Sequence, residues 1–170
     1  MQAEDIITLL GLKPLYIEGG YFRETYRSDE KLDARCLPPR YSGGRELSTA
    51  IYYLVTVDSF SALHRLVSDE VFHFYLGDPV ALLWLFPDGC GETVILGNDL
   101  ASGHVPQCTV RRNTWQGLRL VAGGRWALLG TTVTPAFLPG DFELGDRNEL
   151  IARYPDFTRE IEFLTAPRGR

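Results

Sequence analysis

Apolar and polar positions follow two different periods near the start of the chain. Residues 4–10 begin with an acidic pair and continue with apolar side chains at helical spacing. They are followed by Gly11, a residue type that often ends helices. Residues 21–27 alternate instead with a period of two, which is typical of a strand. The chain is therefore expected to open with a short helix and a first strand.

The middle of the chain is a series of short apolar segments separated by turns. β-Branched and aromatic residues dominate the segments, while Gly, Pro, Asn and Asp punctuate them. The expected strands are residues 47–57, 70–76, 80–86, 92–96, 107–112, 117–121 and 126–133. Many short strands at this spacing predict an antiparallel sandwich or barrel.

Two other segments complete the pattern. Residues 29–45 contain Pro and Gly pairs and form a long polar connection, which is expected to be a mobile loop of the kind that often serves as a lid. Helical character returns at the end, where Asp146 and Glu149 have the spacing of a capping box and residues 157–164 carry an apolar stripe. No domain boundary is visible, so residues 1–170 are predicted to form a single domain.

Composition and charge narrow the class of protein. The chain has 170 residues, with 17 lysines and arginines against 22 aspartates and glutamates, and a net charge of −5. This length suffices for one sizeable core, and the acidic balance argues against nucleic acid as a partner. No apolar run approaches the ~20 residues of a membrane helix, and the first residues lack the features of a signal peptide. We expect a cytoplasmic protein with no nucleic-acid or membrane partner.

The strongest chemical signal is a histidine and a glutamate at the ends of two neighbouring strands. His64, Glu70 and Gly77 have the spacing H-x5-E-x6-G. Such a pair can point into one cavity, where it holds a divalent metal or transfers protons. Strand parity places Glu70 on an apolar face with Phe72, where a carboxylate needs a partner or a raised pKa. The same parity places His73 on the opposite face.

This segment resembles the first motif of the cupin superfamily, G-x5-H-x-H-x3,4-E-x6-G. His64, Glu70 and Gly77 match its first histidine, its glutamate and its last glycine, whereas the second histidine position falls on Leu66. The second cupin motif would end at Gln116, which stands where the family has a histidine. The resemblance implies a mainly β fold, the cupin double-stranded β-helix or jelly-roll barrel. A metal would have only His64, Glu70 and Gln116 as ligands, so we expect a divalent metal to bind weakly or not at all, and no cofactor is certain.

A closer resemblance covers nearly the whole chain. Residues 18–28, residues 68–75, the pair Trp115-Gln116 and residues 141–145 are similar, in this order, to the motifs of one cupin family of unassigned function. That family is often labelled a predicted sugar epimerase because its barrel is similar to nucleotide-sugar epimerases. The label is an inference from fold and implies a carbohydrate substrate only as an expectation.

Two functions remain open at this point. In the first, the protein is a carbohydrate epimerase or isomerase in which His64 removes a proton next to a carbonyl. The resemblance to epimerases implies that a tyrosine returns a proton on the opposite face, with Tyr26, Tyr53 and Tyr75 as candidates. Tyr26 belongs to the family signature and is grouped with His64 and Glu70 as the predicted catalytic set.

In the second function, the protein is a ligand-binding cupin without catalysis that holds a nucleotide or another small anion. The predicted ligand contacts are Phe72, Trp84, Trp115 and Gln116, because aromatic side chains with a few polar groups are typical of small-molecule pockets. Strand parity places Phe72 and Trp84 among the residues that line the barrel or fill its core.

A homodimer is the expected assembly. Open sheets leave edge strands with unpaired backbone groups, which natural proteins cover, and two-fold symmetry is the commonest closed arrangement. We expect the strand at residues 21–27 to cross to a partner's sheet, because both of its faces carry aromatic side chains. His73 and Tyr75 mark a second candidate contact surface.

Overall fold

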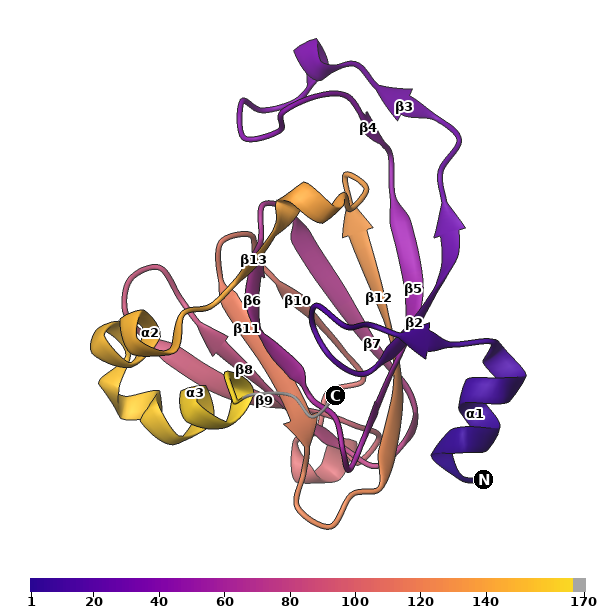
Figure 1. Ribbon diagram of the computed structural model, residues 1–170, viewed down its shortest axis with the longest axis vertical. Coiled ribbons are helices and arrows are strands. Elements are labelled where there is room, and N and C mark those ends of the chain that lie inside the picture. Colours follow the sequence, from indigo (N-terminus) through magenta and orange to yellow (C-terminus); the bar gives the residue numbers. More distant parts are fainter. Residues whose placement is uncertain (167–170) are drawn as a thin grey trace.

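The computed structural model describes residues 1–166, which form two facing antiparallel sheets (Figure 1). The six-stranded sheet contains, in spatial order, β1 (Lys13–Pro14), β2 (Tyr21–Arg27), β5 (Thr49–Thr56), β12 (Trp126–Thr134), β7 (Asp69–Gly77) and β10 (Gln107–Val110). The five-stranded sheet contains β13 (Phe142–Leu144), β6 (Ser61–Leu66), β11 (Trp115–Leu120), β8 (Val80–Leu85) and β9 (Gly91–Leu96). The two sheets stay open at their edges, yet their arrangement is that of a jelly roll, which confirms the expected fold class.

Short helices lie at both ends of the described chain. They are α1 (Ala3–Leu10), α2 (Arg147–Arg153) and α3 (Thr158–Leu164), with the 3-10 turns η1 (Ala34–Cys36), η2 (Leu100–Ser102), η3 (Pro139–Asp141) and η4 (Pro155–Phe157). Gly11 ends α1 in the left-handed conformation, with a φ of 61°, and Asp146 starts α2 by accepting a hydrogen bond of 3.0 Å from the Glu149 backbone. Both predicted helix ends are confirmed. None of the helices within residues 1–166 combines the length and the apolar character that crossing a membrane requires.

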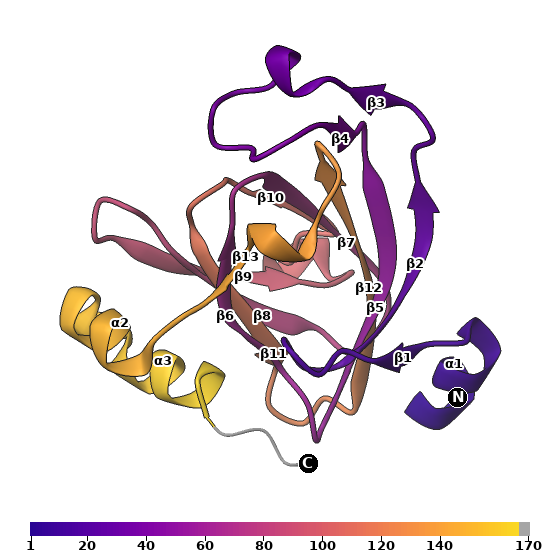
Figure 2. The same cartoon turned by 45° about the horizontal axis from the view of Figure 1, so that its top comes forward.

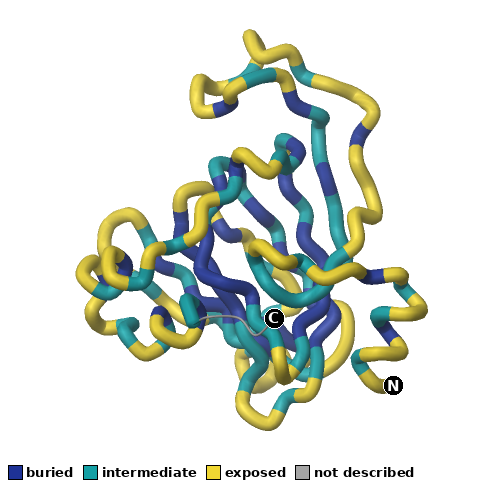
Figure 3. Tube along the Cα trace, in the orientation of Figure 1, coloured by how far each residue is buried: buried dark blue, intermediate teal, exposed yellow. Residues whose placement is uncertain are grey.

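The main hydrophobic core lies between the two sheets. Figure 3 shows buried positions along the strands of both sheets. The buried members of this core are Tyr53, Val55, Phe72, Phe74, Val80, Leu82, Leu96, Val110, Leu118, Ala127 and Leu129. In β7 the buried and half-buried positions alternate, so that Glu70 points inward and His73 outward. The parity predicted for this strand is therefore confirmed.

The helices cover the outer faces of the sheets. Ile6 of α1 packs with Leu54 and Leu128 of the six-stranded sheet. On the other side of the molecule, Leu150 of α2 and Ile161 of α3 belong to a cluster with residues of β6, β8 and β11. These contacts remove apolar side chains from water on the faces opposite the main core.

The predicted polar connection forms an arm that projects beyond the ends of the sheets (Figure 2). We call residues 29–46 the arm. It contains η1 and a two-stranded sheet of β3 (Lys31–Leu32) and β4 (Arg45–Glu46). Arg45 forms a buried ion pair of 2.7 Å with Asp141, so the arm is attached to η3 by a charged contact.

In the single chain described here, β2 does not reach toward a partner's sheet. This strand pairs with β5 of its own chain, where Phe22 lies opposite Tyr53 and Arg23 opposite Tyr52. Its other edge is partly covered by β1, because Phe22 also pairs with Lys13. β1 covers this edge only at Tyr21 and Phe22, so the rest of the strand remains an edge of the sheet. The strand exchange and the dimer both stay predictions.

Candidate functional site

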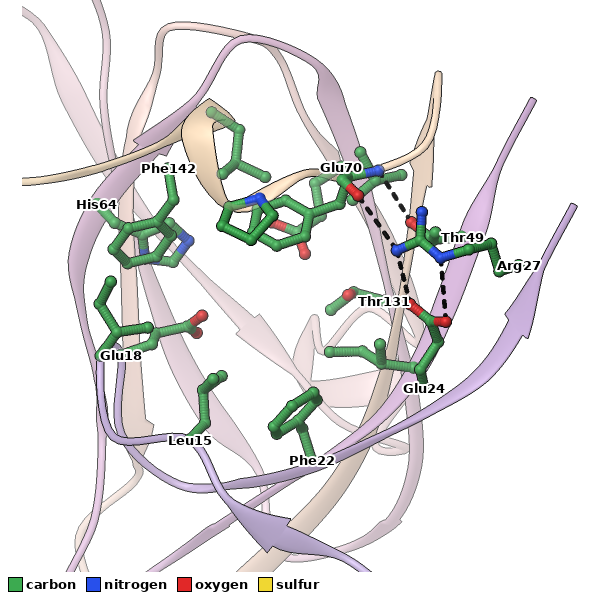
Figure 4. A pocket seen from close by; sticks show the side chains of 16 residues that line it. Leu15, Glu18, Phe22, Glu24, Arg27, Thr49, His64, Glu70, Thr131 and Phe142 are labelled. Carbon is green, nitrogen blue, oxygen red and sulfur yellow. Dashed lines mark hydrogen bonds and ion pairs between the residues drawn. The ribbon is translucent and has the colours of Figure 1, made fainter. Parts of the chain in front are cut away.

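A cavity of about 360 Å³ lies between the two sheets (Figure 4). Its lining comes from β2, β5, β6, β7 and β12, together with residues 15–18 and 137–142. The apolar lining residues are Leu15, Ile17, Phe22, Ile51, Leu66, Val133, Phe137, Pro139 and Phe142, and the polar ones are Glu18, Glu24, Arg27, Thr49, His64, Glu70 and Thr131. Both its volume and its mixture of apolar walls with a few polar groups are typical of small-molecule sites.

His64 on β6 is held in one orientation. Its side chain is buried, and its ring stacks on Phe142 with 4.7 Å between the ring centroids. The Nδ1 atom lies 2.8 Å from the carbonyl oxygen of Ala62. Because a carbonyl only accepts hydrogen bonds, Nδ1 carries the proton and Nε2 keeps its lone pair. This tautomer is the one that a general base acting through Nε2 requires.

Gln116 joins His64 to Glu70 across the two sheets. Its Nε2 atom donates a hydrogen bond of 2.6 Å to Oε2 of Glu70 and lies 3.3 Å from Nε2 of His64. Gln116 lies opposite His64 in the β6–β11 register, whereas Glu70 belongs to the other sheet. The three side chains that the sequence analysis grouped are thus brought together beside the cavity. Within residues 1–166, the Gln116 carbonyl oxygen is buried without a hydrogen-bond partner.

The surroundings of Glu70 favour its neutral form. Burial raises the pKa of Glu70, and the negative charge of Glu18 raises it further. A protonated His64 ring acts in the opposite direction, as do hydrogen bonds from Thr131 and Gln116, but the net pKa stays above the ordinary value. A buried carboxyl group that keeps its proton can act as an acid.

Glu18 is a second carboxylate in the cavity, and the sequence analysis did not assign it a role there. Figure 4 shows its side chain pointing into the cavity near His64. Its Oε1 atom accepts a hydrogen bond of 2.5 Å from Oγ of Ser61. Burial and the negative charge of Glu18 hold the pKa of Tyr53 well above its ordinary value. Glu18 lies in the turn before β2, where no periodic pattern indicates which way a side chain points.

Arg27 lines the cavity as its basic side chain, and it is already paired. Its guanidinium group forms ion pairs with Glu24, at 2.8 Å, and with Glu46, at 3.3 Å. It also donates to the carbonyl oxygen of Phe137. The hydrogen bond with Glu24 is the main reason that the pKa of Arg27 is raised. The positive charge is therefore neutralised by two carboxylates.

Tyr26 lies outside the cavity, contrary to its predicted catalytic role. Its side chain is 54% exposed, and the β2–β5 register shifts between Glu24 and Tyr26. A bulge reverses the direction of the following side chains, so Arg27 lines the cavity where regular alternation would place Tyr26. Neither Tyr53 nor Tyr75 lines the cavity.

The three aromatic residues predicted as ligand contacts do not line the cavity either. Phe72 is buried in the main core, and Trp84 packs against the same cluster. Trp115 belongs to the cluster beneath α2 and α3, with the guanidinium carbon of Arg65 4.5 Å from its ring centroid. The inward direction predicted for Phe72 and Trp84 is compatible with the fold, but core packing occupies these side chains.

The donor set at this site does not fit the metal of the cupin motif. No group of three or more His, Cys, Asp or Glu side chains placed to hold a metal ion occurs within residues 1–166. Gln116 directs its amide nitrogen, a hydrogen-bond donor, at His64 and Glu70. Leu66 lines the cavity at the second histidine position and offers no donor atom.

Comparison with known proteins places this chain in a family. A family model described as Cupin superfamily (DUF985) matches residues 4–145. The uncharacterized protein YML079W of Saccharomyces cerevisiae is 30% identical over 135 residues, which is 74% of this chain and 65% of the yeast protein. The match thus spans slightly less than two thirds of that relative's length.

Solved structures are also similar to this chain in sequence and in fold. Protein SO0799 from Shewanella oneidensis is 33% identical, with a TM-score of 0.86 over 98% of this chain and 99% of its own. A hypothetical protein from Leishmania major is 31% identical, with a TM-score of 0.86 over 96% of this chain and 98% of its own. Oxalate decarboxylase from Bacillus subtilis is 12% identical, with a TM-score of 0.52 over 89% of this chain and 36% of its own, and this likeness concerns the fold alone. The chain therefore belongs to the Cupin_5 family (DUF985) of the cupin superfamily.

Proposed function

We propose that the protein is a small-molecule isomerase or epimerase that moves protons with His64 and Glu70. The observation that carries this proposal is the position of the Gln116 amide, whose nitrogen lies within hydrogen-bond distance of both side chains. One buried group thus holds a base and an acid next to the same cavity. Geometry of this kind is what general acid–base catalysis requires.

The two side chains have complementary roles in the proposal. The long contact of 3.3 Å from the Gln116 amide gives way to substrate, and Nε2 of His64 takes a proton from a carbon next to the substrate carbonyl. The electrons of the C–H bond form a C=C bond, and the π electrons of the carbonyl group move to its oxygen. The neutral carboxyl group of Glu70 donates a hydrogen bond or its proton to that oxygen, giving an enol. In a hydroxy-carbonyl substrate, transfer of the proton from His64 to the former carbonyl carbon, while the carboxylate of Glu70 takes the proton of the neighbouring hydroxyl group, completes an isomerisation. Delivery of a proton to the original carbon from the opposite face, with return of the enol proton to Glu70, completes an epimerisation.

The expected tyrosine has no place in this mechanism, because none of the three candidates lines the cavity. In the proposed mechanism, the carboxyl group of Glu70 is the acid in place of the tyrosine. A nucleotide sugar is also disfavoured as the substrate, since its diphosphate needs cationic or amide donors and Arg27 is already paired with Glu24 and Glu46. We therefore propose a small carbonyl compound without phosphate groups, such as a free sugar.

Hydrogen–deuterium exchange tests the proposal directly. The protein is incubated in D2O with free aldoses, ketoses and other hydroxy-carbonyl compounds, and proton NMR follows the loss of the signal next to the carbonyl. His64→Ala should slow the exchange by about 10²–10⁴-fold, whereas His104→Ala, in a turn away from the cavity, should leave it unchanged. Exchange at the wild-type rate in His64→Ala would remove this residue from the mechanism.

The non-catalytic alternative predicts a different result in the same experiment. A compound that raises the melting temperature but exchanges no proton would identify a ligand-binding cupin, because binding to the folded state raises apparent stability. The charges in the cavity do not favour the small anion expected from the sequence. Glu18, Glu24 and Glu70 line it against Arg27 as its fully cationic side chain.

A further inference from the structure

The polar side chains on one side of the cavity already have partners within the protein. Figure 4 shows Glu24, Arg27 and Thr49 together there, across the cavity from His64. Arg27 is paired with Glu24 at 2.8 Å and donates to the carbonyl oxygen of Phe137. The hydroxyl oxygen of Thr49 accepts a hydrogen bond of 3.1 Å from the backbone nitrogen of Phe137. This side of the cavity therefore offers a ligand little unused hydrogen-bonding capacity.

The polar groups that remain for a ligand gather around His64. Glu70 lies next to His64, because the Gln116 amide nitrogen is within hydrogen-bond distance of both side chains. Glu18 is half-buried and binds the hydroxyl group of Ser61 through Oε1, so its Oε2 atom can accept a hydrogen bond from a ligand. The lone pair of His64, the acid proton of Glu70 and one acceptor on Glu18 match a single carbonyl group with a neighbouring hydroxyl group.

Hydrocarbon side chains form the wall between these two groups of polar residues. Nine of the sixteen lining residues are apolar, among them Phe22, Ile51, Val133 and Phe137. A free sugar carries a hydroxyl group on nearly every carbon atom. A hydroxyl group that leaves water without finding a hydrogen-bond partner costs free energy. Most hydroxyl groups of a sugar would face hydrocarbon in this cavity, so its walls favour a ligand with few of them.

We infer that the substrate of this cavity is a neutral α-hydroxy ketone with a compact hydrocarbon body. Its carbonyl and hydroxyl groups lie between His64, Glu70 and Glu18, and its body lies against Phe22 and Ile51. The cavity volume of about 360 Å³ is near the lower end of the range for small-molecule sites, which limits the size of the body. This assignment rests on the proposed function for the chemistry of the head group, and it narrows the small carbonyl compounds proposed there to the apolar ones.

An ionised head group fits the same cavity less well. A carboxylate would be repelled by Glu18 and Glu24, which line the cavity. A cation would find a neutral acid in Glu70 and only the half-buried Glu18 as its counter-charge. A neutral hydroxy-carbonyl head group uses the lone pair of His64, the proton of Glu70 and the acceptor of Glu18 at the same time.

Two ligands with the same six-membered carbon ring test the inference: trans-cyclohexanediol, with two neighbouring hydroxyl groups, and myo-inositol, with six. Calorimetry and thermal shift should show the diol binding at least about tenfold more tightly than myo-inositol, a difference of about 1.4 kcal/mol. Val133→Thr keeps the shape of the wall and adds a hydroxyl group to it, so this variant should reduce the ratio of the two affinities by about threefold or more. Val57→Thr, at a valine that is 67% exposed and outside the cavity, is the matched control and should keep the wild-type ratio.

The affinity ratio in the wild-type protein decides the test even where Val133→Thr folds poorly. Myo-inositol or xylose binding as tightly as the diol would overturn the inference. A diol that does not bind at millimolar concentrations would also overturn it. So would an equal affinity ratio in the wild-type protein and in folded Val133→Thr, because the ligand body would then not lie against this wall.

Binding and proton exchange give separate results. Preference for the diol without exchange on hydroxycyclohexanone or on any sugar supports the inference and contradicts the proposed function. Exchange on xylose that is faster than exchange on hydroxycyclohexanone supports the proposed function and contradicts the inference. His64→Ala should slow the exchange but keep the preference for the diol, because the hydrocarbon wall is unchanged.

Discussion

The amide nitrogen of Gln116 on β11 lies 2.6 Å from Oε2 of Glu70 on β7, so one hydrogen bond joins the two sheets beside the cavity. The partner of this buried carboxyl group is a neutral amide instead of a cation. Burial therefore dominates, and the pKa of Glu70 is raised. This single contact links the stability of the fold to the chemistry proposed for the site.

The raised pKa of Glu70 makes stability depend on pH in a defined direction. The folded protein keeps this proton at pH values where the unfolded chain, with an ordinary pKa of about 4.3, has lost it. Relative to Glu70→Gln, the wild-type free energy of unfolding should be fully favourable below that pH and fall as pH rises through the folded-state pKa. The loss is about 1.4 kcal/mol for each unit of elevation. Urea unfolding of both proteins from pH 4 to pH 8 measures it, and a constant difference would contradict the prediction.

Restoring the cupin ligands should create a metal site. Leu66 follows His64 by two positions on β6, so both side chains face the cavity. The double variant Leu66→His/Gln116→His supplies three histidines and Glu70, enough for a catalytic-type site. We expect this variant to keep about one equivalent of Mn²⁺ or Zn²⁺ after dialysis, measured by elemental analysis.

Wild-type protein and Leu66→Asn/Gln116→Asn are the controls for that experiment, and both should lose the metal on dialysis. Stoichiometric metal in the wild-type protein that is absent from His64→Ala would show that the site holds a metal without redesign.

Removing only one partner of the ion pair that attaches the arm should lower the free energy of unfolding more than removing both charges does. The side chains of Arg45 and Asp141 are 4% and 5% exposed, with 2.7 Å between Nη2 and Oδ1. Arg45→Met leaves a buried carboxylate and should lower the free energy of unfolding by about 3–5 kcal/mol. Arg45→Met/Asp141→Asn should recover most of this loss.

Arg111→Met serves as the control for the buried pair, because its ion pair with Asp69 has an arginine side chain that is 76% exposed. Its cost should be about 1 kcal/mol or less in the same urea titration. Equal losses in Arg45→Met and Arg111→Met would show that burial does not govern the pair.

We propose that the outer face of the six-stranded sheet forms the contact between two copies of the chain. Tyr75 is 43% exposed there and lies close to His73 and Tyr52, with ring centroids 6.3 Å and 6.0 Å away. Grouped aromatic side chains on an exposed sheet face are typical of protein interfaces. Sedimentation at micromolar concentration should give about twice the chain mass of 19.1 kDa.

Tyr75→Glu should shift the protein to a monomer in that experiment by placing a charge in the contact. Tyr16→Glu changes a tyrosine that is 87% exposed elsewhere and should leave the dimer intact. A wild-type protein that sediments as a monomer would exclude the dimer.

Local sequence patterns were sufficient to predict the secondary-structure elements and the family. The left-handed Gly11, the cap at Asp146 and the alternation along β7 each depend on neighbours within a few residues, so they were readable in order along the chain. The spacing from His64 to Glu70 places the two residues on consecutive strands of the chain, which is why the pair could be predicted as a site. The identity of the superfamily follows from the same local motifs.

The partners of these residues were beyond local patterns, because they come from distant parts of the chain. Glu18 sits in a turn, and only the packing of that turn against β6 brings it beside His64. The bulge in β2 depends on pairing with β5, and it exchanges Tyr26 for Arg27 in the cavity. A shift of one residue in register reverses every side chain after it, and alternation alone does not reveal such a shift.

The sequence by itself thus determined a jelly-roll cupin with His64 and Glu70 as its chemical centre, since strand periodicity and motif spacing are local properties. Only the tertiary structure decided what surrounds that centre: a neutral amide between acid and base, a second carboxylate, and no tyrosine or free cation among the lining residues. The physical reason is that charge, burial and the pKa of a buried group depend on side chains packed from both sheets, and their approach is set by the fold.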